Sequence, residues 1–216
     1  MAIVGAAAFS EFFLLTLYLQ DVLDYSALRA GVAFSAFALT VVVASNLAQL
    51  IVSRIGARAT LTIGLLMFAA SIAYVTRLPV HGNYFVDLFP AFVIGGAGMG
   101  FSFVPITISA LAGVHPADAG IASGLVNTSR QIGGAIGLAA TGAIAAASTS
   151  GYLASHPALS ATSGAALDHG FQTALLSLAG LLLLGAAVVA VGLRAPRSSE
   201  VRPLRETETL AFEEAA

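Results

Sequence analysis

The sequence predicts an all-α integral membrane protein with six transmembrane helices. Of its 216 residues, 58% are hydrophobic and only 9% are charged, whereas soluble domains carry roughly 25% charged residues. So few charges cannot cover a water-facing surface, so lipid must surround most of the chain. The apolar residues also form runs of the length that a helix needs to cross a bilayer, about 20 residues. Such runs are too long for barrel strands, and a helix pairs all of their backbone groups in lipid.

The six predicted spans cover residues of about 2–20, 30–53, 59–77, 86–111, 118–147 and 170–193. The first span starts at once, without the basic leader of a secretory signal, so we expect the chain to begin part-way through a larger membrane protein. Residues 1–194 then form one six-helix transmembrane unit. The mixture of Arg, Glu, Pro and Ser at 195–216 predicts a disordered cytoplasmic tail. The Ser- and Ala-rich segment 148–170 predicts the longest outside loop, with room for one short helix.

Arginine placement predicts the orientation in the membrane. If both termini are cytoplasmic, the inside carries six arginines: Arg54 and Arg58 between the second and third spans, and Arg194, Arg197, Arg202 and Arg205 in the tail. The outside then carries only Arg29 and Arg77. This distribution follows the positive-inside rule and predicts a protein of the plasma (inner) membrane with both ends in the cytoplasm.

Residue types that are absent exclude several functions. The chain has no Cys, so it has neither a disulfide framework nor a thiolate metal site, and we expect no bound metal. All nine cationic residues are Arg, so a phosphate loop of the Walker type, which needs Lys, is excluded. The formal net charge of −2 argues against nucleic acid as a partner. We therefore expect the lipid bilayer and a small-molecule substrate as partners, no cofactor, and no catalytic residues.

The span at 118–147 has two different sides at 100° per residue. One side is small or polar and the other is apolar, with Ile121, Leu125, Ile132, Ile136 and Ala143. The small and polar side must face protein or a water-filled cavity; it contains Gly120, Ser123, Gly124, Asn127, Arg130, Gln131, Gly134, Thr141 and Gly142.

Arg130 lies roughly 18 Å from the cytoplasmic end of this helix, near the middle of the bilayer. An arginine at that depth costs about 2.5–3.5 kcal/mol. Three roles are open: a structural tie to a neighbouring helix, a direct role in substrate or proton handling, or a gating contact. Asn127 and Gln131 beside it predict hydrogen bonds between helices, with ligand contacts as the alternative.

Glu11 is an acidic residue in the middle of the first span. A buried carboxyl needs a partner when it is charged, and one that switches between charge states suits proton-coupled transport. The alternative is that Glu11 lies near a frayed helix end and reaches water. A Glu11–Arg130 pair is possible by charge and depth, but the sequence does not show whether the two helices touch.

The fourth span contains the glycine-rich run GGAGMGFSFVP at residues 95–105. It lacks the third glycine of a dinucleotide-binding loop, so it does not predict a nucleotide site. Gly96 and Gly100 form a GxxxG pair that permits close helix packing. The functional alternative is a flexible, cavity-lining helix that bends near Pro105. In the second span, Asn46, Gln49 and Ser53 share one face, which predicts a protein-facing side.

Three segments give the chain a family resemblance. ASGLVNTSRQIGGAIGLA at 122–139 resembles an Asn-Thr-x-Arg-Gln-x-Gly-Gly run of the major facilitator superfamily, in its fourteen-helix drug:proton antiporter branch (EmrB/QacA type). LYLQDVLDYSALRAG at 17–31 and GGAGMGFSFVP at 95–105 also resemble segments of that branch. The resemblance covers residues 1–194 and implies the C-terminal six-helix half of such a transporter. Within its motif, Asn127, Arg130, Gln131, Gly133 and Gly134 match, and Gly124, Gly133 and Gly134 are the candidates for helix packing or flexibility.

The loop between the second and third spans is a weak copy of the superfamily's G-x-x-x-D-R-x-G-R-R motif. Arg54, Gly56 and Arg58 are in place, but the Gly and Asp positions hold Gln49 and Ser53. A weak copy is usual in C-terminal halves, so it supports that assignment. In the family the position of Glu11 is generally apolar, so the resemblance assigns Glu11 no role.

The resemblance implies proton-coupled efflux of hydrophobic or cationic drugs, with the proton gradient as the energy source. The substrate then lies between two six-helix bundles, so the chain would need an N-terminal half or a second copy. It is a fragment, one part of a split transporter, or a half that forms homodimers. A non-transporting assembly or regulatory protein is the alternative.

An intramembrane serine protease is excluded because Ser123 lacks the G-x-S-G context and the four histidines lie in loops or at helix ends. The Arg130 stretch is best interpreted as an interface and gating element, with substrate contact second.

Overall fold

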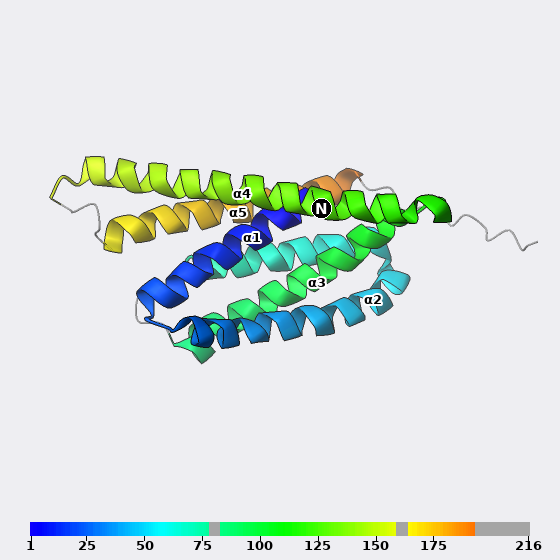
Figure 1. The fold of residues 1–216 in the computed structure, drawn as a ribbon, viewed down its shortest axis with the longest axis horizontal. Helices are drawn as coiled ribbons and strands as arrows, with labels where there is room; N and C mark the ends of the chain where they lie inside the picture. Colours follow the sequence, from blue (N-terminus) through cyan, green and yellow to red (C-terminus); the bar gives the residue numbers. More distant parts are fainter. Residues whose placement is uncertain (78–82, 159–163, 193–216) are drawn as a thin grey trace, which may run out of the picture.

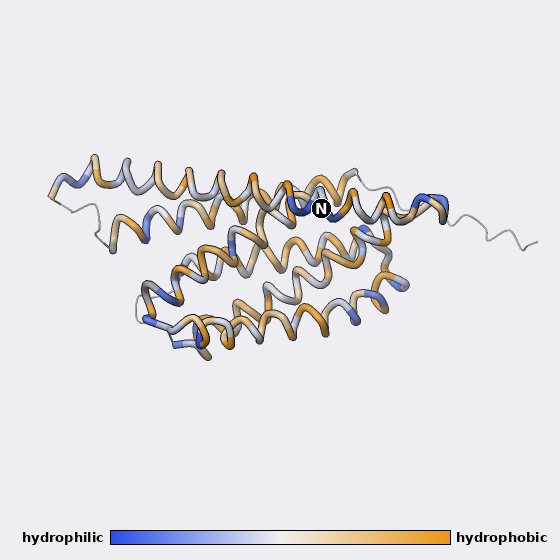
Figure 2. Tube along the Cα trace, viewed as in Figure 1, coloured by the Kyte–Doolittle hydropathy of each residue, from blue (hydrophilic) through white to orange (hydrophobic). Residues whose placement is uncertain are grey.

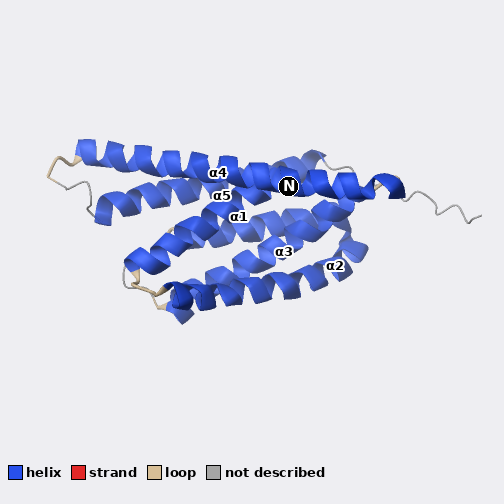
Figure 3. Cartoon of the chain, viewed as in Figure 1, coloured by secondary structure: helices blue, strands red, loops and turns tan. Residues whose placement is uncertain are grey.

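The structure is a computed structural model that describes residues 1–77, 83–158 and 164–192, and within these ranges it contains helices and connecting loops only (Figure 3). The main helices are α1 (Ala2–Leu17), α2 (Ala27–Val75), α3 (Phe89–Leu111), α4 (Ala119–Ser155) and α5 (Gly164–Gly192). Short π-helical turns at Tyr18–Val22 and Tyr84–Leu88 follow α1 and precede α3, and a 3-10 turn at Pro116–Asp118 leads into α4. Five helical segments of the described chain are long and apolar enough to cross a membrane. Apolar residues run along the length of these helices (Figure 2).

α2 is one element of 49 residues that is interrupted at Gly56, where φ is 82° and ψ is 162°. A straight helix of that length would be roughly 74 Å long, more than twice the hydrocarbon core of about 30 Å. The positive φ at Gly56 lies in the left-handed region that favours glycine because it has no Cβ. Gly56 therefore divides α2 into a first arm at 27–55 and a second arm at 57–75.

Contacts with α3 show how the two arms of α2 run. Along α3, a Cβ on Gly96 would lie 2.7 Å from the carbonyl oxygen of Phe37, and one on Gly100 would lie 2.8 Å from the Cβ of Ala44. On the second arm the order is reversed, because Gly95 faces Ser71 whereas Gly64 faces Ser102. α3 is thus parallel to the first arm and antiparallel to the second. The chain turns back on itself at Gly56, as Figure 1 also shows.

The observed helices differ from the predicted spans mainly near 148–170. The segment predicted as a long loop is largely helical, because α4 continues to Ser155 and α5 begins at Gly164. Hydroxyl groups at both ends of this stretch of α4 bond to their own helix: Thr149 Oγ1 donates to the Ala145 carbonyl at 2.9 Å and Ser155 Oγ to the Tyr152 carbonyl at 2.8 Å. This satisfies the polar side chains without ending the helix. Gly170 of α5 packs on the turn at Thr149, so α4 and α5 extend side by side (Figure 1). The predicted tail at 195–216 lies outside the described residues.

Apolar packing joins the helices into one bundle. The main core combines residues of α1, of the second arm of α2 and of α5, including the fully buried Phe68, Ile72 and Leu182. A second contact region is aromatic: the rings of Phe12 (α1) and Phe34 (first arm) stack with centroids 4.9 Å apart, and Phe34 lies 5.2 Å from Phe92 of α3. Two hydrogen bonds fasten the start of α3 to both arms, from Ser71 Oγ to the Ala91 carbonyl and from the Tyr84 hydroxyl to the Ala33 carbonyl, each 2.8 Å.

We predict that Gly56→Ala lowers the stability of the chain by about 1–3 kcal/mol, because a Cβ is strained at this positive φ. The space around Gly56 is open within 4 Å, so no steric clash contributes. Gly31→Ala is the matched control, since Gly31 is also in open space but lies inside the first arm of α2 without a positive φ. The thermal unfolding midpoint in detergent should fall for Gly56→Ala and stay or rise for Gly31→Ala. Equal midpoints for the two variants would contradict a backbone constraint at Gly56.

Candidate functional site

The candidate site lies on α4, which is only lightly covered by the rest of the described chain. Of its 37 residues, Gly133, Gly134, Gly137 and Thr141 are buried. The side predicted to face lipid is open, with Ile121, Leu125 and Ile136 exposed by 68%, 65% and 65%. Burial is thus confined to one short stripe, and this stripe fixes how α4 sits on its neighbours.

The buried stripe of α4 packs against small residues of α1. A Cβ on Gly133 would collide with the backbone of Ala2, and a Cβ on Gly137 would collide with Ala6. Four residues further along both helices, the Thr141 hydroxyl donates to the Gly137 carbonyl at 2.7 Å, and its oxygen lies within hydrogen-bond distance of Ser10 Oγ, at 3.2 Å. We call this contact the glycine seam. Because residue numbers rise together along it, α1 and α4 run parallel with their backbones in direct contact.

The small and polar side of α4 is divided into two parts. Gly134 and Thr141, in its C-terminal part, are buried, whereas Ser123, Asn127 and Gln131 are exposed. Gly124 and Gly142 have no neighbour within 4 Å of an added Cβ. Gly124 therefore has no packing partner within the described chain, and its role in helix packing or flexibility stays a prediction. An uncovered polar stretch, defined by Gly120, Ser123, Gly124, Asn127 and Gln131, remains on the N-terminal part of α4.

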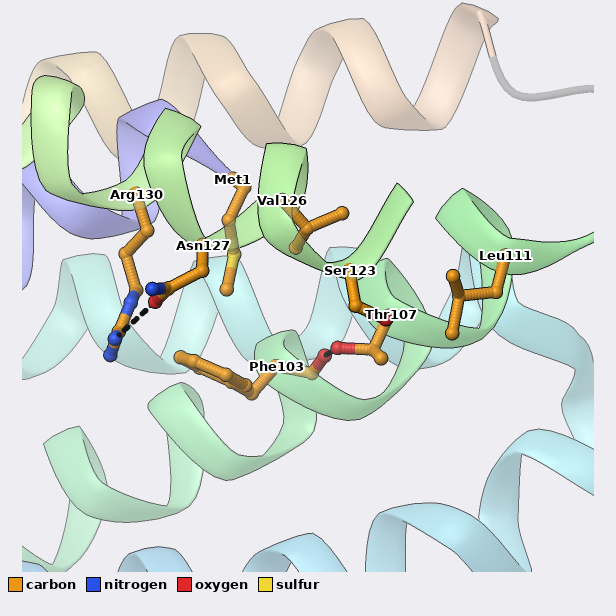
Figure 4. Close-up of a pocket in the computed structure, with 8 residues that line it drawn as sticks. All are labelled: Met1, Phe103, Thr107, Leu111, Ser123, Val126, Asn127 and Arg130. Atoms are coloured by element: carbon orange, nitrogen blue, oxygen red, sulfur yellow. Dashed lines mark hydrogen bonds between the residues drawn. The ribbon is translucent and has the colours of Figure 1, made fainter. Parts of the chain in front are cut away.

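Arg130 lies where the glycine seam meets this uncovered stretch. Its backbone carbonyl packs on Gly5 of α1 so closely that a Cβ there would collide. Its side chain points toward α3, where the guanidinium carbon lies 5.4 Å from the centre of the Phe103 ring. Arg130 Nη2 donates to Asn127 Oδ1 at 2.7 Å (Figure 4). The buried Arg130 Nε has no hydrogen-bond partner among the described residues. The positive charge is therefore held by one neutral amide and one aromatic ring.

A pocket of about 260 Å³ opens between α3 and α4 at this point. α3 contributes Phe103, Thr107 and Leu111, and α4 contributes Ser123, Val126, Asn127 and Arg130, with Met1 beside them. In Figure 4 the lining has a graded character: Arg130 and Asn127 lie at one end, the hydroxyls of Ser123 and Thr107 further along, and Leu111 at the other end. Pro105 lies in the adjacent part of α3, which continues through it as a helix to Leu111.

Glu11 lies elsewhere in the bundle. Its side chain is 2% exposed, and Oε2 has no hydrogen-bond partner in the described part of the chain. It does not reach water, so the alternative of a frayed, hydrated helix end is wrong. In the seam Gly5 faces Arg130, and Glu11 is six residues beyond Gly5, or roughly 9 Å along α1. The described residues contain no Glu11–Arg130 ion pair, although their two helices do touch.

The remaining predicted residues lie apart from this pocket. Arg54 and Arg58 are exposed on either side of Gly56, at the turn between the arms of α2. Asn46, Gln49 and Ser53 are exposed on the first arm, where Asn46 Nδ2 donates to the Val42 carbonyl of its own helix at 2.8 Å. Gly96 and Gly100 lie in the contact between α3 and the first arm, and Gly133 and Gly134 lie in the glycine seam.

The sequence interpretation missed the partner of the seam. Gly137 was not singled out, and nor were Ala2, Ala6 and Ser10 of α1. A signal was present, since small residues recur every four positions at 2, 6 and 10 and again at 133, 137 and 141. Two such stripes in long apolar helices are what close backbone packing in a membrane needs.

An all-helical bundle of long apolar helices, with a partly buried arginine beside a pocket, defines an integral membrane protein with a polar site inside the membrane. Residues 1–138 match the model of the Major Facilitator Superfamily. The chain therefore belongs to the Major Facilitator Superfamily.

Several characterised or named relatives are similar to the chain. It is 37% identical over 183 residues to the puromycin resistance protein pur8 of Streptomyces alboniger, a match that covers 83% of this chain and 36% of that protein. It is 31% identical over 210 residues to the uncharacterized MFS-type transporter EfpA of Mycobacterium tuberculosis (strain ATCC 25618 / H37Rv), covering 94% of this chain and 39% of EfpA. It is 36% identical over 160 residues to the cephamycin export protein CmcT of Amycolatopsis lactamdurans, covering 72% of this chain and 33% of CmcT. The chain thus spans less than two fifths of the length of these relatives.

We predict that the double variant Ser10→Cys with Thr141→Cys forms a disulfide in the membrane under mild oxidation, because the two side-chain oxygens are 3.2 Å apart across the glycine seam. The chain has no cysteine of its own, so the product is unambiguous. The matched control joins Ser10→Cys to Gly142→Cys, one residue further along α4, where the space around Gly142 is open. A shift in non-reducing electrophoresis should appear for the first pair and not for the second. Cross-linking of both pairs at the same rate would refute the parallel seam.

Proposed function

We propose that this chain is the C-terminal six-helix half of a drug:proton antiporter of the fourteen-helix branch, which exports hydrophobic or cationic compounds across the plasma membrane. The observation that carries the proposal is the match to relatives named for puromycin resistance and cephamycin export, over 83% and 72% of the chain. Counting the two arms of α2 separately gives six crossings. In this proposal the chain performs no catalysis and uses the proton gradient in place of a cofactor.

The proposed orientation places both termini in the cytoplasm. Arg54 and Arg58, exposed beside Gly56, then lie at the cytoplasmic turn between the arms of α2. An even number of crossings returns the chain to the side on which it began. Positive residues concentrated on that side agree with the positive-inside rule.

The uncovered polar stretch of α4 supports a second six-helix bundle as partner. Polar groups and glycines on a membrane helix normally face protein or a water-filled cavity. Here Ser123, Asn127 and Gln131 are exposed within the chain. In the proposed transporter an N-terminal half covers this stretch, and a second copy of the chain is the alternative occupant. Arg130, at the edge of the stretch, would then act as a gating residue at the boundary between the two six-helix halves.

Glu11 is the residue we propose for proton handling. Ionisable groups inside a membrane bundle are energetically expensive and usually functional. The burial of Glu11 and the unpartnered Oε2 distinguish it from a carboxylate held in a structural ion pair.

A transport assay tests the proposed function. The longer protein that carries this chain behind its N-terminal helices is reconstituted in proteoliposomes, and uptake of a lipophilic cation is followed with and without a pH gradient. We expect transport that depends on the gradient, and little or none from the 216-residue chain alone. Transport that ignores the gradient would remove proton coupling, and robust transport by the chain alone would remove the need for a second bundle.

We predict that Arg130→Ala lowers transport by the longer protein about tenfold or more, because it removes the charge-assisted bond to Asn127 and the ring contact with Phe103. The protein should still insert, since the contacts of Gly133, Gly137 and Thr141 in the glycine seam do not involve the Arg130 side chain. Arg29→Ala is the control, because Arg29 stacks on Tyr25 at 3.8 Å, outside the pocket. The measurement is the initial rate of transport by each variant at equal protein level. A wild-type rate for Arg130→Ala would show that the role of Arg130 is purely structural.

We predict that Glu11→Gln keeps the size of the buried side chain but weakens the response of transport to the pH gradient, because an amide cannot exchange a proton. Exchange of labelled substrate without a gradient should remain within about twofold of wild type, since it needs no net proton movement. Glu11→Asp, which keeps an exchangeable carboxyl at this position, is the control and should retain the response. An unchanged response to the gradient in Glu11→Gln would show that protons move elsewhere.

A further inference from the structure

The pocket between α3 and α4 has a cation at one end and apolar groups at the other. Arg130 is the only ionisable side chain among the residues that line it. Within the described chain no carboxylate forms an ion pair with Arg130, whose side-chain partners are Asn127 and the Phe103 ring. The buried Nε–H still lacks an acceptor. No carboxylate of the described residues balances the guanidinium charge at this end of the pocket, so this end is suited to an anionic acceptor.

The opposite end of the pocket is suited to an apolar body. Leu111 lines that end, Val126 lies between Asn127 and Ser123 in the middle of the pocket, and the Phe103 ring forms part of the wall near Arg130 (Figure 4). Ser123 and Arg130 are seven residues apart on α4, a separation of roughly 10 Å along the helix. With a volume of about 260 Å³, the pocket has room for a small molecule only. Ligand pockets for drug-sized molecules typically begin near 300 Å³.

The depth of Arg130 separates two sources of an anion. It lies eleven residues from Ala119, the first residue of α4, which is roughly 17 Å along the helix axis. Phospholipid headgroups lie outside a hydrocarbon core of about 30 Å, so a headgroup would have to enter to about the middle of the bilayer to reach Arg130. A small organic anion that enters the pocket whole has no such restriction.

We propose that the pocket between α3 and α4 binds small organic carboxylates with an apolar body, the carboxylate at Arg130 and the body along Phe103, Val126 and Leu111. This binding is a property of the chain itself and does not depend on transport. Its ligand has the opposite charge to the cationic compounds proposed above as export substrates. Experiments can therefore refute carboxylate binding without refuting export, and export without refuting carboxylate binding.

The test uses the full 216-residue chain in nanodiscs of zwitterionic lipid and a matched pair of probes. 4-Phenylbutyrate and 4-phenylbutylamine share one carbon skeleton and differ in the sign of their charge. Isothermal titration calorimetry should give saturable binding of 4-phenylbutyrate and binding at least about tenfold weaker for the amine. Equal affinity for the two probes would overturn the proposal.

Three variants locate the binding site. Arg130→Gln should weaken 4-phenylbutyrate binding about tenfold or more, because the guanidinium supplies the charge. Arg29→Gln removes a cation outside the pocket and should bind as wild type. Ser123→Phe fills the pocket from an exposed position on α4 and leaves Arg130 in place, so it should also abolish binding. If Arg130→Gln does not fold, Ser123→Phe decides the result, and wild-type affinity in Ser123→Phe would place any binding outside the pocket.

A final experiment tests whether a lipid headgroup, instead of a small organic anion, is the ligand of Arg130. Phosphatidylglycerol at about one tenth of the nanodisc lipid should leave the affinity for 4-phenylbutyrate unchanged when nanodiscs of equal size are compared. Loss of binding in the wild type, with no such loss when phosphatidylcholine is added instead, would show that a lipid headgroup occupies Arg130. That outcome would overturn the assignment to small carboxylates.

Discussion

The direct backbone contact between α1 and α4 sets the position of everything else in the candidate site. Lipid supplies no hydrophobic driving force between helices, so two helices stay together through close packing and hydrogen bonds. The glycine seam provides both, with Gly133 and Gly137 against Ala2 and Ala6 and with the Ser10–Thr141 hydrogen bond. It fixes the carbonyl of Arg130 on α1, which leaves only the guanidinium free to reach α3. The pocket exists because α4 is held at its middle and uncovered toward its N-terminal end.

Two ionisable candidate residues, Arg130 and Glu11, have different surroundings, although both lie in membrane helices. Arg130 is partly accessible, bonded to Asn127 and beside a pocket that a ligand can enter. Glu11 is 2% exposed and enclosed by the packed helices. A group of the first kind can meet a molecule from outside, whereas a group of the second kind can exchange a proton only if the bundle opens or water reaches it. Under the two proposals made above, the recognition site and the site of proton exchange are separate.

The sequence predicted the helical membrane fold well because its signals are local. Apolar length, the glycines of 95–100 and the two sides of the 118–147 span each depend on residues close together in the chain. It could not show that the described residues contain no ion pair between Arg130 and Glu11, because that pair depends on the rotation of α1 against α4. It overestimated the loop at 148–170, because serine and threonine are typical of loops but also bond to carbonyls of their own helix, as Thr149 does. Nor could it show that the space around Gly124 is open in the described chain, because a helical wheel shows a face but not where along the helix a neighbour touches it.

The seam also has a consequence for the order in which the chain assembles. Ser10 and Thr141 are separated by 131 positions, whereas α2 and α3 pack within one continuous stretch from Ala27 to Leu111. Chains are made from the N-terminus, and local packing forms before distant packing. The hairpin of α2 and the adjoining α3 can therefore settle while synthesis continues. The small residues of α1 can be covered by α4 only once α4 has been made, so this contact is among the later ones to form within the described chain.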